Sequence, residues 1–144
     1  MNKDFEARLA VNNEALTQER KKHSKEAREL MLQIPEGTQK IEEGAYAARA
    51  DISRVVIPEG VVEIGDEAFI FCDQLVSITL PSTLKRIGNS AFQECVNLGE
   101  IHFPEGLEEI GMAAFCHCFS LEVHGLSKAV KLGELAFHRV PGLS

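Results

Sequence analysis

A repeating unit of 23 residues constrains the fold of this chain more than any other feature of its sequence. The units begin at Ile34, Ile57, Leu80, Phe103 and Gly125, so they are 23, 23, 23 and 22 residues apart. Four positions of the unit hold one type of residue in every copy. They form a first aliphatic column (Ile41, Ile64, Ile87, Ile110, Leu132), an alanine column (Ala45, Ala68, Ala91, Ala114, Ala136), an aromatic column (Tyr46, Phe69, Phe92, Phe115, Phe137) and a second aliphatic column (Ile52, Leu75, Leu98, Leu121, Leu143). Because one unit cannot bury these side chains alone, the units must stack into a solenoid with a continuous core.

Each unit contains one segment typical of a strand and one typical of a helical turn. In residues 75–80 the apolar residues at 75, 78 and 80 follow the L-x-x-L-x-L pattern of a strand, and Pro81 ends it. After Gly65, the residues Ala68 and Cys72 are four apart, as on one face of a helix. Asp66 is a suitable N-cap there, as is Asn89 in the next unit. We therefore expect an α/β repeat with short strands on the concave face and short helical turns on the convex side.

The pattern P-E-G-L-x-x-I-G-x-x-A-F-x-x-C-x-x-L-x-x-I resembles the BspA-type leucine-rich repeat. It extends over residues 34–144 and is clearest in the units that begin at Ile57, Leu80 and Phe103. The resemblance implies a curved, right-handed solenoid that binds proteins or surfaces, often in adhesion, rather than an enzyme. Many members of that family are exported.

The two ends of the chain depart from the repeat. Residues 1–33 contain neither Pro nor Gly and are rich in helix formers, so we expect an N-terminal helical cap there and a solenoid of about five units over 34–144. A partner-binding or coiled-coil helix and a disordered arm are the alternatives for residues 1–33. The first unit has Arg49 where the next three units have cysteine, a polar substitution that a terminal repeat tolerates. The last unit stops at Leu143-Ser144 before its next strand, which suggests either homodimerisation through the C-terminal edge or truncation of a longer array.

Charge and hydropathy restrict the class of partner. Residues 1–33 hold seven basic and six acidic side chains, whereas residues 34–144 hold eight basic and sixteen acidic ones. This acidity argues against nucleic acid as a partner and favours a basic one. No apolar run approaches the roughly 20 residues of a membrane span, and the first residues contain no signal-peptide core. The chain as given is therefore expected to be cytoplasmic, or at a surface or secreted if a signal has been trimmed from it.

The four cysteines invite a metal or redox interpretation. Cys72, Cys95 and Cys118 recur every 23 residues at one position of the unit, so we expect them to be buried as free thiols in the core. Cys116, His117 and Cys118 could begin a zinc site, but zinc needs four ligands, or three and a water, and no second cysteine pair exists. We predict no metal site, no cofactor and no catalytic residue.

The outward-facing residues of the strands are the best candidates for function. Side chains alternate between the two faces of a strand, so two positions of each unit should project together from the concave face, where repeat proteins usually bind. These candidate partner-binding residues are Arg54, Ser77, Thr79, Glu100, His102, Glu122 and His124. The sequence predicts a protein-interaction module that binds a protein or peptide through this face. The alternative is a structural or assembly protein that self-associates through its N-terminal helix or its C-terminal repeat edge.

Overall fold

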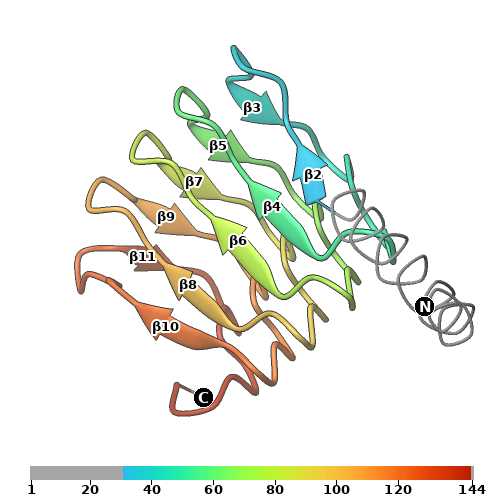
Figure 1. Cartoon of the computed structure of the whole chain (residues 1–144). Helices are drawn as coiled ribbons and strands as arrows, with labels where there is room; N and C mark the ends of the chain where they lie inside the picture. Colours follow the sequence, from blue (N-terminus) through green and yellow to red (C-terminus); the bar gives the residue numbers. More distant parts are fainter. Residues whose placement is uncertain (1–30, 144) are drawn as a thin grey trace, which may run out of the picture. The chain divides into compact units, whose positions relative to one another are not determined.

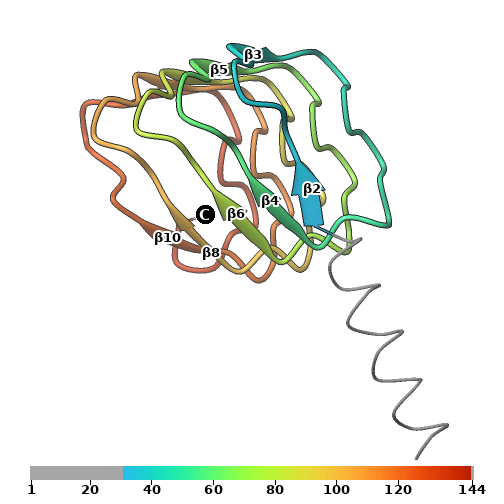
Figure 2. The same cartoon turned by 45° about the horizontal axis from the view of Figure 1, so that its top comes forward.

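The computed structural model describes residues 31–143, in which the chain forms parallel β-strands and no helix (Figure 1). Three-residue strands form the long-strand face: β2 (Met31–Gln33), β4 (Arg54–Val56), β6 (Ser77–Thr79), β8 (Glu100–His102) and β10 (Glu122–His124). Two-residue strands form the short-strand sheet: β3 (Lys40–Ile41), β5 (Glu63–Ile64), β7 (Arg86–Ile87), β9 (Glu109–Ile110) and β11 (Lys131–Leu132). Each repeat thus contributes one strand to each of two layers, which Figure 2 shows from a second direction.

Neighbouring strands pair at a register of one repeat. Arg54 lies opposite Ser77, Glu63 lies opposite Arg86, and Glu122 lies opposite Glu100. The short-strand sheet is continuous from β3 to β11, whereas the long-strand face consists of the ladders β2–β4–β6 and β8–β10. These two ladders are joined where β6 and β8 begin, since the Gly99 N–H donates to the Val76 carbonyl at 3.1 Å. Equivalent residues of successive repeats therefore lie side by side along the stack.

The core lies between the two layers and consists of the predicted columns. Members of the aromatic column stack with ring centroids 5.1–5.4 Å apart. Phe69, Phe92 and Phe115 are completely buried in it. The columns are exposed at the ends of the stack, where Ala45 and Leu132 are accessible to solvent. The solenoid and its stacked core are thus confirmed.

The predicted helical turns on the convex side are wrong. The segment after the glycine of a repeat has two left-handed residues four positions apart, such as Glu67 with φ 58° and Phe71 with φ 62°. Its N–H groups alternate between two acceptors: that of Ala68 donates to Gly65 of its own repeat, and that of Phe69 donates to Ala91 of the next. An α-helix needs uninterrupted right-handed residues and bonds within its own segment. Backbone hydrogen bonds between repeats replace it here.

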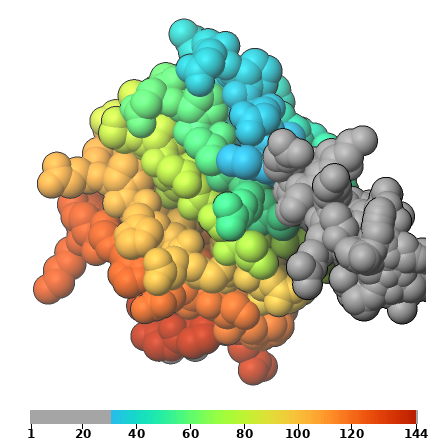
Figure 3. All heavy atoms as spheres, viewed as in Figure 1, coloured from blue at the N-terminus to red at the C-terminus, as the bar shows by residue number. Residues whose placement is uncertain are grey.

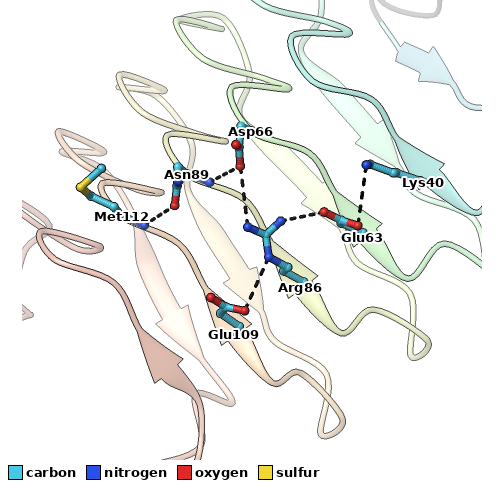
Figure 4. Close-up of polar contacts among 7 residues, drawn as sticks. All are labelled: Lys40, Glu63, Asp66, Arg86, Asn89, Glu109 and Met112. Atoms are coloured by element: carbon cyan, nitrogen blue, oxygen red, sulfur yellow. Dashed lines mark hydrogen bonds and ion pairs between the residues drawn. The ribbon is translucent and has the colours of Figure 1, made fainter.

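Asp66 and Asn89 also do not cap helices. The Asp66 Oδ1 accepts the N–H of Asn89 at 2.8 Å, and the Asn89 Oδ1 accepts the N–H of Met112 at 2.8 Å (Figure 4). Each side chain therefore bonds the backbone of the following repeat. The glycine beside them is required by space, because a Cβ on Gly88 would lie 2.5 Å from the Asp66 Oδ1 and 2.6 Å from its backbone nitrogen.

The predicted N-terminal cap falls mainly outside the described residues, as do its alternatives, the coiled-coil helix and the disordered arm. Its last three residues, Met31–Gln33, form strand β2 and not a helix. β2 begins 23 residues before β4, which is one repeat length. It is therefore the long strand that comes just before the unit that begins at Ile34. Within residues 31–143 no helix is long and apolar enough to cross a membrane.

Candidate functional site

The predicted binding residues lie on the outward side of the long-strand face. In β4, β6 and β8 the middle residue is buried (Val55, Ile78, Ile101), while the residues before and after it point outward. This alternation arises because side chains of a strand project to opposite faces with a period of two. The outward residues form two rows across the repeats. The first row is Arg54, Ser77, Glu100 and Glu122, and the second is Val56, Thr79, His102 and His124.

All seven predicted residues therefore share one surface, and Val56 joins them. Val56 is 42% exposed and lies in the row of Thr79, although its apolar character gave no reason to select it. Figure 3 shows this surface with the repeats as successive bands of colour. Its chemistry changes along the stack. The part over β4 and β6 is cationic to neutral, whereas the part over β8 and β10 carries carboxylates and imidazoles.

A cluster of two histidines and two glutamates occupies the β8–β10 part. The rings of His102 and His124 stack with centroids 4.5 Å apart and planes 12° apart, as the repeat register predicts. The His102 Nε2 lies 3.3 Å from the Glu100 Oε1, and the His124 Nε2 lies 3.6 Å from the Glu122 Oε2. The His124 Nε2 is buried and has no hydrogen-bond partner. Within residues 31–143 this is the one place where three potential metal ligands converge: Glu100, His102 and His124.

The cysteines are core residues, as predicted for three of them. Cys72, Cys95 and Cys118 are completely buried, and each thiol donates to a carbonyl of the preceding repeat's aromatic column, at 3.1–3.2 Å. Burial raises the pKa of the Cys118 thiol to about 12 and that of Cys95 further still. Cys116 is buried too, and its pKa is raised by burial and then by the charge of Glu94. These thiols are free, and the pKa shifts disfavour the thiolate that nucleophilic chemistry needs.

An ion-pair ladder on the short-strand sheet was not anticipated from the sequence. The Arg86 guanidinium contacts three carboxylates (Figure 4). Its Nη1 lies 2.7 Å from the Glu63 Oε2, its Nε lies 3.5 Å from the Glu109 Oε1, and its Nη2 lies 3.9 Å from the Asp66 Oδ1. The signal was present, since residues 40, 63, 86, 109 and 131 occupy one position of the unit and alternate in charge. These side chains are partly exposed, so each pair contributes no more than about 1 kcal/mol to stability. These ion pairs join successive repeats and so support the stack.

A histidine on the convex side was likewise not singled out for its contacts. The His117 Nδ1 lies 2.5 Å from the Glu94 Oε2 of the preceding repeat, and its ring stacks on Phe119 at 5.5 Å. Phe71 and Phe119, which lie outside the core columns, are both 53% exposed. His117 is therefore held by its neighbours, whereas the neighbouring Cys118 is completely buried and its thiol donates to the Phe92 carbonyl.

The last described repeat presents exposed apolar side chains. Leu132, Leu135 and Leu143 are 48%, 58% and 45% exposed, although two of them belong to the aliphatic columns. All three line an open hollow of about 290 Å³, together with Gly133 and residues 136–138. This edge of the stack is a second candidate surface for contacts with another molecule.

The comparisons with known proteins agree with the repeat architecture. Residues 28–144 match the family model described as BspA type Leucine rich repeat region, in six copies. A leucine-rich repeat protein of T. pallidum is 33% identical over 76% of this chain and 55% of its own, with a TM-score of 0.70. One from Bacteroides ovatus shares the fold, with 23% identity over 79% of this chain and 36% of its own and a TM-score of 0.63.

A leucine rich cell surface protein from Faecalibacterium prausnitzii is 27% identical over 69% of this chain and 33% of its own, with a TM-score of 0.54. This chain thus spans only part of the length of these three structures. A search of curated proteins found no significant match. The repeat columns, the two layers of parallel strands and the six matched copies lead to one conclusion: the chain belongs to the BspA-type leucine-rich repeat family.

Proposed function

We propose that this chain is a protein-interaction module that binds an extended protein or peptide segment across the long-strand face. One observation carries the proposal: two rows of outward side chains lie in register across β4, β6, β8 and β10 above a completely buried core. Backbone groups of these strands bond to one another, so the side chains make the contacts. A rigid array of this kind loses little conformational entropy when it binds.

The charge of the face favours a basic segment over its β8–β10 part. Glu100 and Glu122 are both exposed there, and the repeat region as a whole has sixteen acidic against eight basic residues. Electrostatic complementarity of this kind guides a partner into register and selects against acidic competitors. Uncharged residues of a partner would face Ser77, Thr79 and Val56 on the neighbouring strands.

A peptide-display selection with the full chain as bait tests the proposal. The variant Ser77→Ala/Thr79→Ala/His102→Ala removes the centre of the face, and we expect the selected peptides to bind it at least about tenfold more weakly. The matched control Gln74→Ala/Gln93→Ala/His138→Ala changes polar side chains elsewhere on the repeats and should bind them normally. Equal binding by the two triple variants, or loss in the control alone, would move the site away from this face.

A second candidate function is self-association through the last repeat. Its support is the exposure of Leu132, Leu135 and Leu143 at an edge where strand β11 has a neighbour on one side, β9. A second copy that covered these leucines would bury apolar surface and pair free strand-edge groups. Light scattering across a hundredfold dilution series tests it. The mass should fall on dilution and stay monomeric in Leu135→Glu, whereas a monomer at every concentration excludes this function.

A further inference from the structure

We propose that Glu100, His102, Glu122 and His124 form a binding site for one divalent transition-metal ion of the zinc class on strands β8 and β10. The side-chain ligand atoms of Glu100, His102 and His124 already lie within 4.8 Å of one another. Glu122 supplies a fourth, since its Oε2 lies 3.6 Å from the His124 Nε2. Two strands in register therefore present two carboxylates and two imidazoles at the corners of one small patch.

The state of His124 points independently to a ligand at this position. Its Nε2 is shielded from solvent and lacks a hydrogen-bond partner. A polar atom that is desolvated and has no hydrogen-bond partner is unfavourable, so such atoms are rare in folded proteins. A metal ion bound to this nitrogen would remove that cost. The neighbouring His102 lies parallel to it at 4.5 Å and can supply a second imidazole nitrogen to the same ion.

The donor set selects the class of metal. Imidazole nitrogen suits zinc, copper and nickel, whereas calcium and magnesium prefer oxygen ligands alone. Bonds of about 2.0–2.1 Å place tetrahedral ligands about 3.3 Å apart, so the ligand atoms of Glu100, His102 and His124, which lie within 4.8 Å of one another, must approach by up to about 1.5 Å. Rotation of the side chains of Glu100 and His102 can provide this, because both are more than half exposed.

Charge around the cluster supports a divalent cation. Two carboxylates and two neutral imidazoles sum to −2, which matches the ion. The neighbouring strand β6 presents the uncharged Ser77 and Thr79, and the nearest cation of the same rows, Arg54, lies on β4, two strands from β8. No fixed positive charge among the outward residues of β6, β8 and β10 therefore opposes binding. The hydrogen-bonded backbone of β8 and β10 holds the four side chains in this order.

Zinc titration of the untagged, reduced full chain by calorimetry tests the site. We expect one ion per chain. The zinc affinity should fall at least about tenfold in Glu100→Gln, which preserves side-chain shape. It should fall by a similar factor in the separate variant His124→Ala. The matched controls are His117→Ala and Cys116→Ser on the convex side, which should bind zinc as the unchanged chain does. Circular dichroism of every variant separates lost ligands from lost fold.

Cobalt substitution identifies the ligand atoms. Cobalt bound to nitrogen and oxygen should lack the intense thiolate charge-transfer absorption of a cysteine site. Absence of stoichiometric zinc binding would overturn the proposal. So would unchanged affinity in both Glu100→Gln and His124→Ala, loss of binding in Cys116→Ser, or a thiolate band with cobalt. Peptide binding is measured without metal, and only His102 belongs both to the triple variant and to the proposed ligands, so the two proposals can fail separately.

Discussion

Phe92 shows how one residue of the unit contributes to the whole stack. It is completely buried, and its ring lies 5.2 Å from that of Phe69 and 5.1 Å from that of Phe115. Phe92→Ala should lower the free energy of unfolding by about 3–5 kcal/mol, because it leaves a cavity in a column that cannot collapse around it. Urea denaturation measures the loss. The control is Phe71→Ala, at a side chain that is 53% exposed, where the change should stay within about 0.5 kcal/mol. Equal losses would mean that the column does not carry the stability.

The buried cysteines should be inert towards alkylating reagents. The thiolate is the reactive form, and burial raises the pKa of Cys118 to about 12. Because this pKa is raised, the folded chain keeps the proton as the pH rises past the ordinary thiol value of 9.0. We expect no modification of Cys95 or Cys118 by iodoacetamide at pH 8, and complete modification in concentrated urea, as peptide mass spectrometry would show. Rapid labelling of the native chain at these two positions would contradict their burial.

At the scale of the element, the turns on the convex side have an energetic signature that a helix would lack. Glu67 is exposed and has φ 58°, a conformation that costs an L-residue about 1–2 kcal/mol and a glycine almost nothing. Glu67→Gly should therefore stabilise the fold by about 0.5–1 kcal/mol, despite the greater entropy of the unfolded glycine. Thermal and urea unfolding would measure this gain.

Glu108 provides the control for that substitution. It is also an exposed glutamate, but its backbone is not left-handed, and its N–H donates to the Lys85 carbonyl at 2.9 Å. Glu108→Gly should lower the free energy of unfolding by about 0.5–1 kcal/mol, the opposite sign. The same sign for both substitutions would show that the left-handed turn does not set the effect.

The long strands could be predicted from the sequence, whereas the short strands and the turns could not. A single unit shows apolar alternation around Val55, Ile78 and Ile101, so its strand is visible locally. The short strands contain two residues each, one of them buried in every short strand except β11, and leave no period to detect. The spacing of Ala68 and Cys72 imitates a helix. What decides against a helix is the bond from Phe69 to Ala91 in the next repeat, a contact that no single unit encodes.

The candidate site was predictable to the same extent. The register of the repeats placed Glu100, His102, Glu122 and His124 in adjacent rows, and the structure has them there. The sequence could not show that the His124 Nε2 is shielded and unpaired, because this depends on how the two rings stack. That single atom changes the prediction for the cluster from a solvated surface without metal to a proposed ligand set.

For the molecule as a whole, the stack is one-dimensional: each repeat contacts the repeats before and after it. Stability then divides into a contribution from each repeat and one from each interface between neighbours. A central repeat such as that around Ile87 is covered on both sides and is completely buried in its columns. The repeat that contains Leu132 has a described neighbour on one side, and this leucine is 48% exposed where its counterparts are buried. The energy of opening should therefore vary along the chain.

Amide hydrogen exchange can measure that variation repeat by repeat. The N–H groups of Lys131 and Gly133 donate to the carbonyls of Glu108 and Ile110, at 2.9 and 2.8 Å, so their exchange reports opening of the last described repeat. We expect them to exchange at least about tenfold faster than equivalent amides around β7, since a repeat with one described interface instead of two should open with an energy lower by more than about 1.4 kcal/mol.

Substitutions at two places along the aromatic column, one at the last described repeat and one in the middle of the stack, distinguish local from global opening. Phe137→Ala should accelerate exchange mainly in residues 131–143, whereas Phe92→Ala should accelerate it in the repeats on both sides of β7, because it weakens two interfaces instead of one. Uniform exchange along the unchanged chain, or the same pattern in both variants, would mean that the repeats open as one cooperative unit. If the chain opens from its last described repeat, the amide hydrogens of that repeat exchange with solvent while the long-strand face over β4 and β6 stays intact.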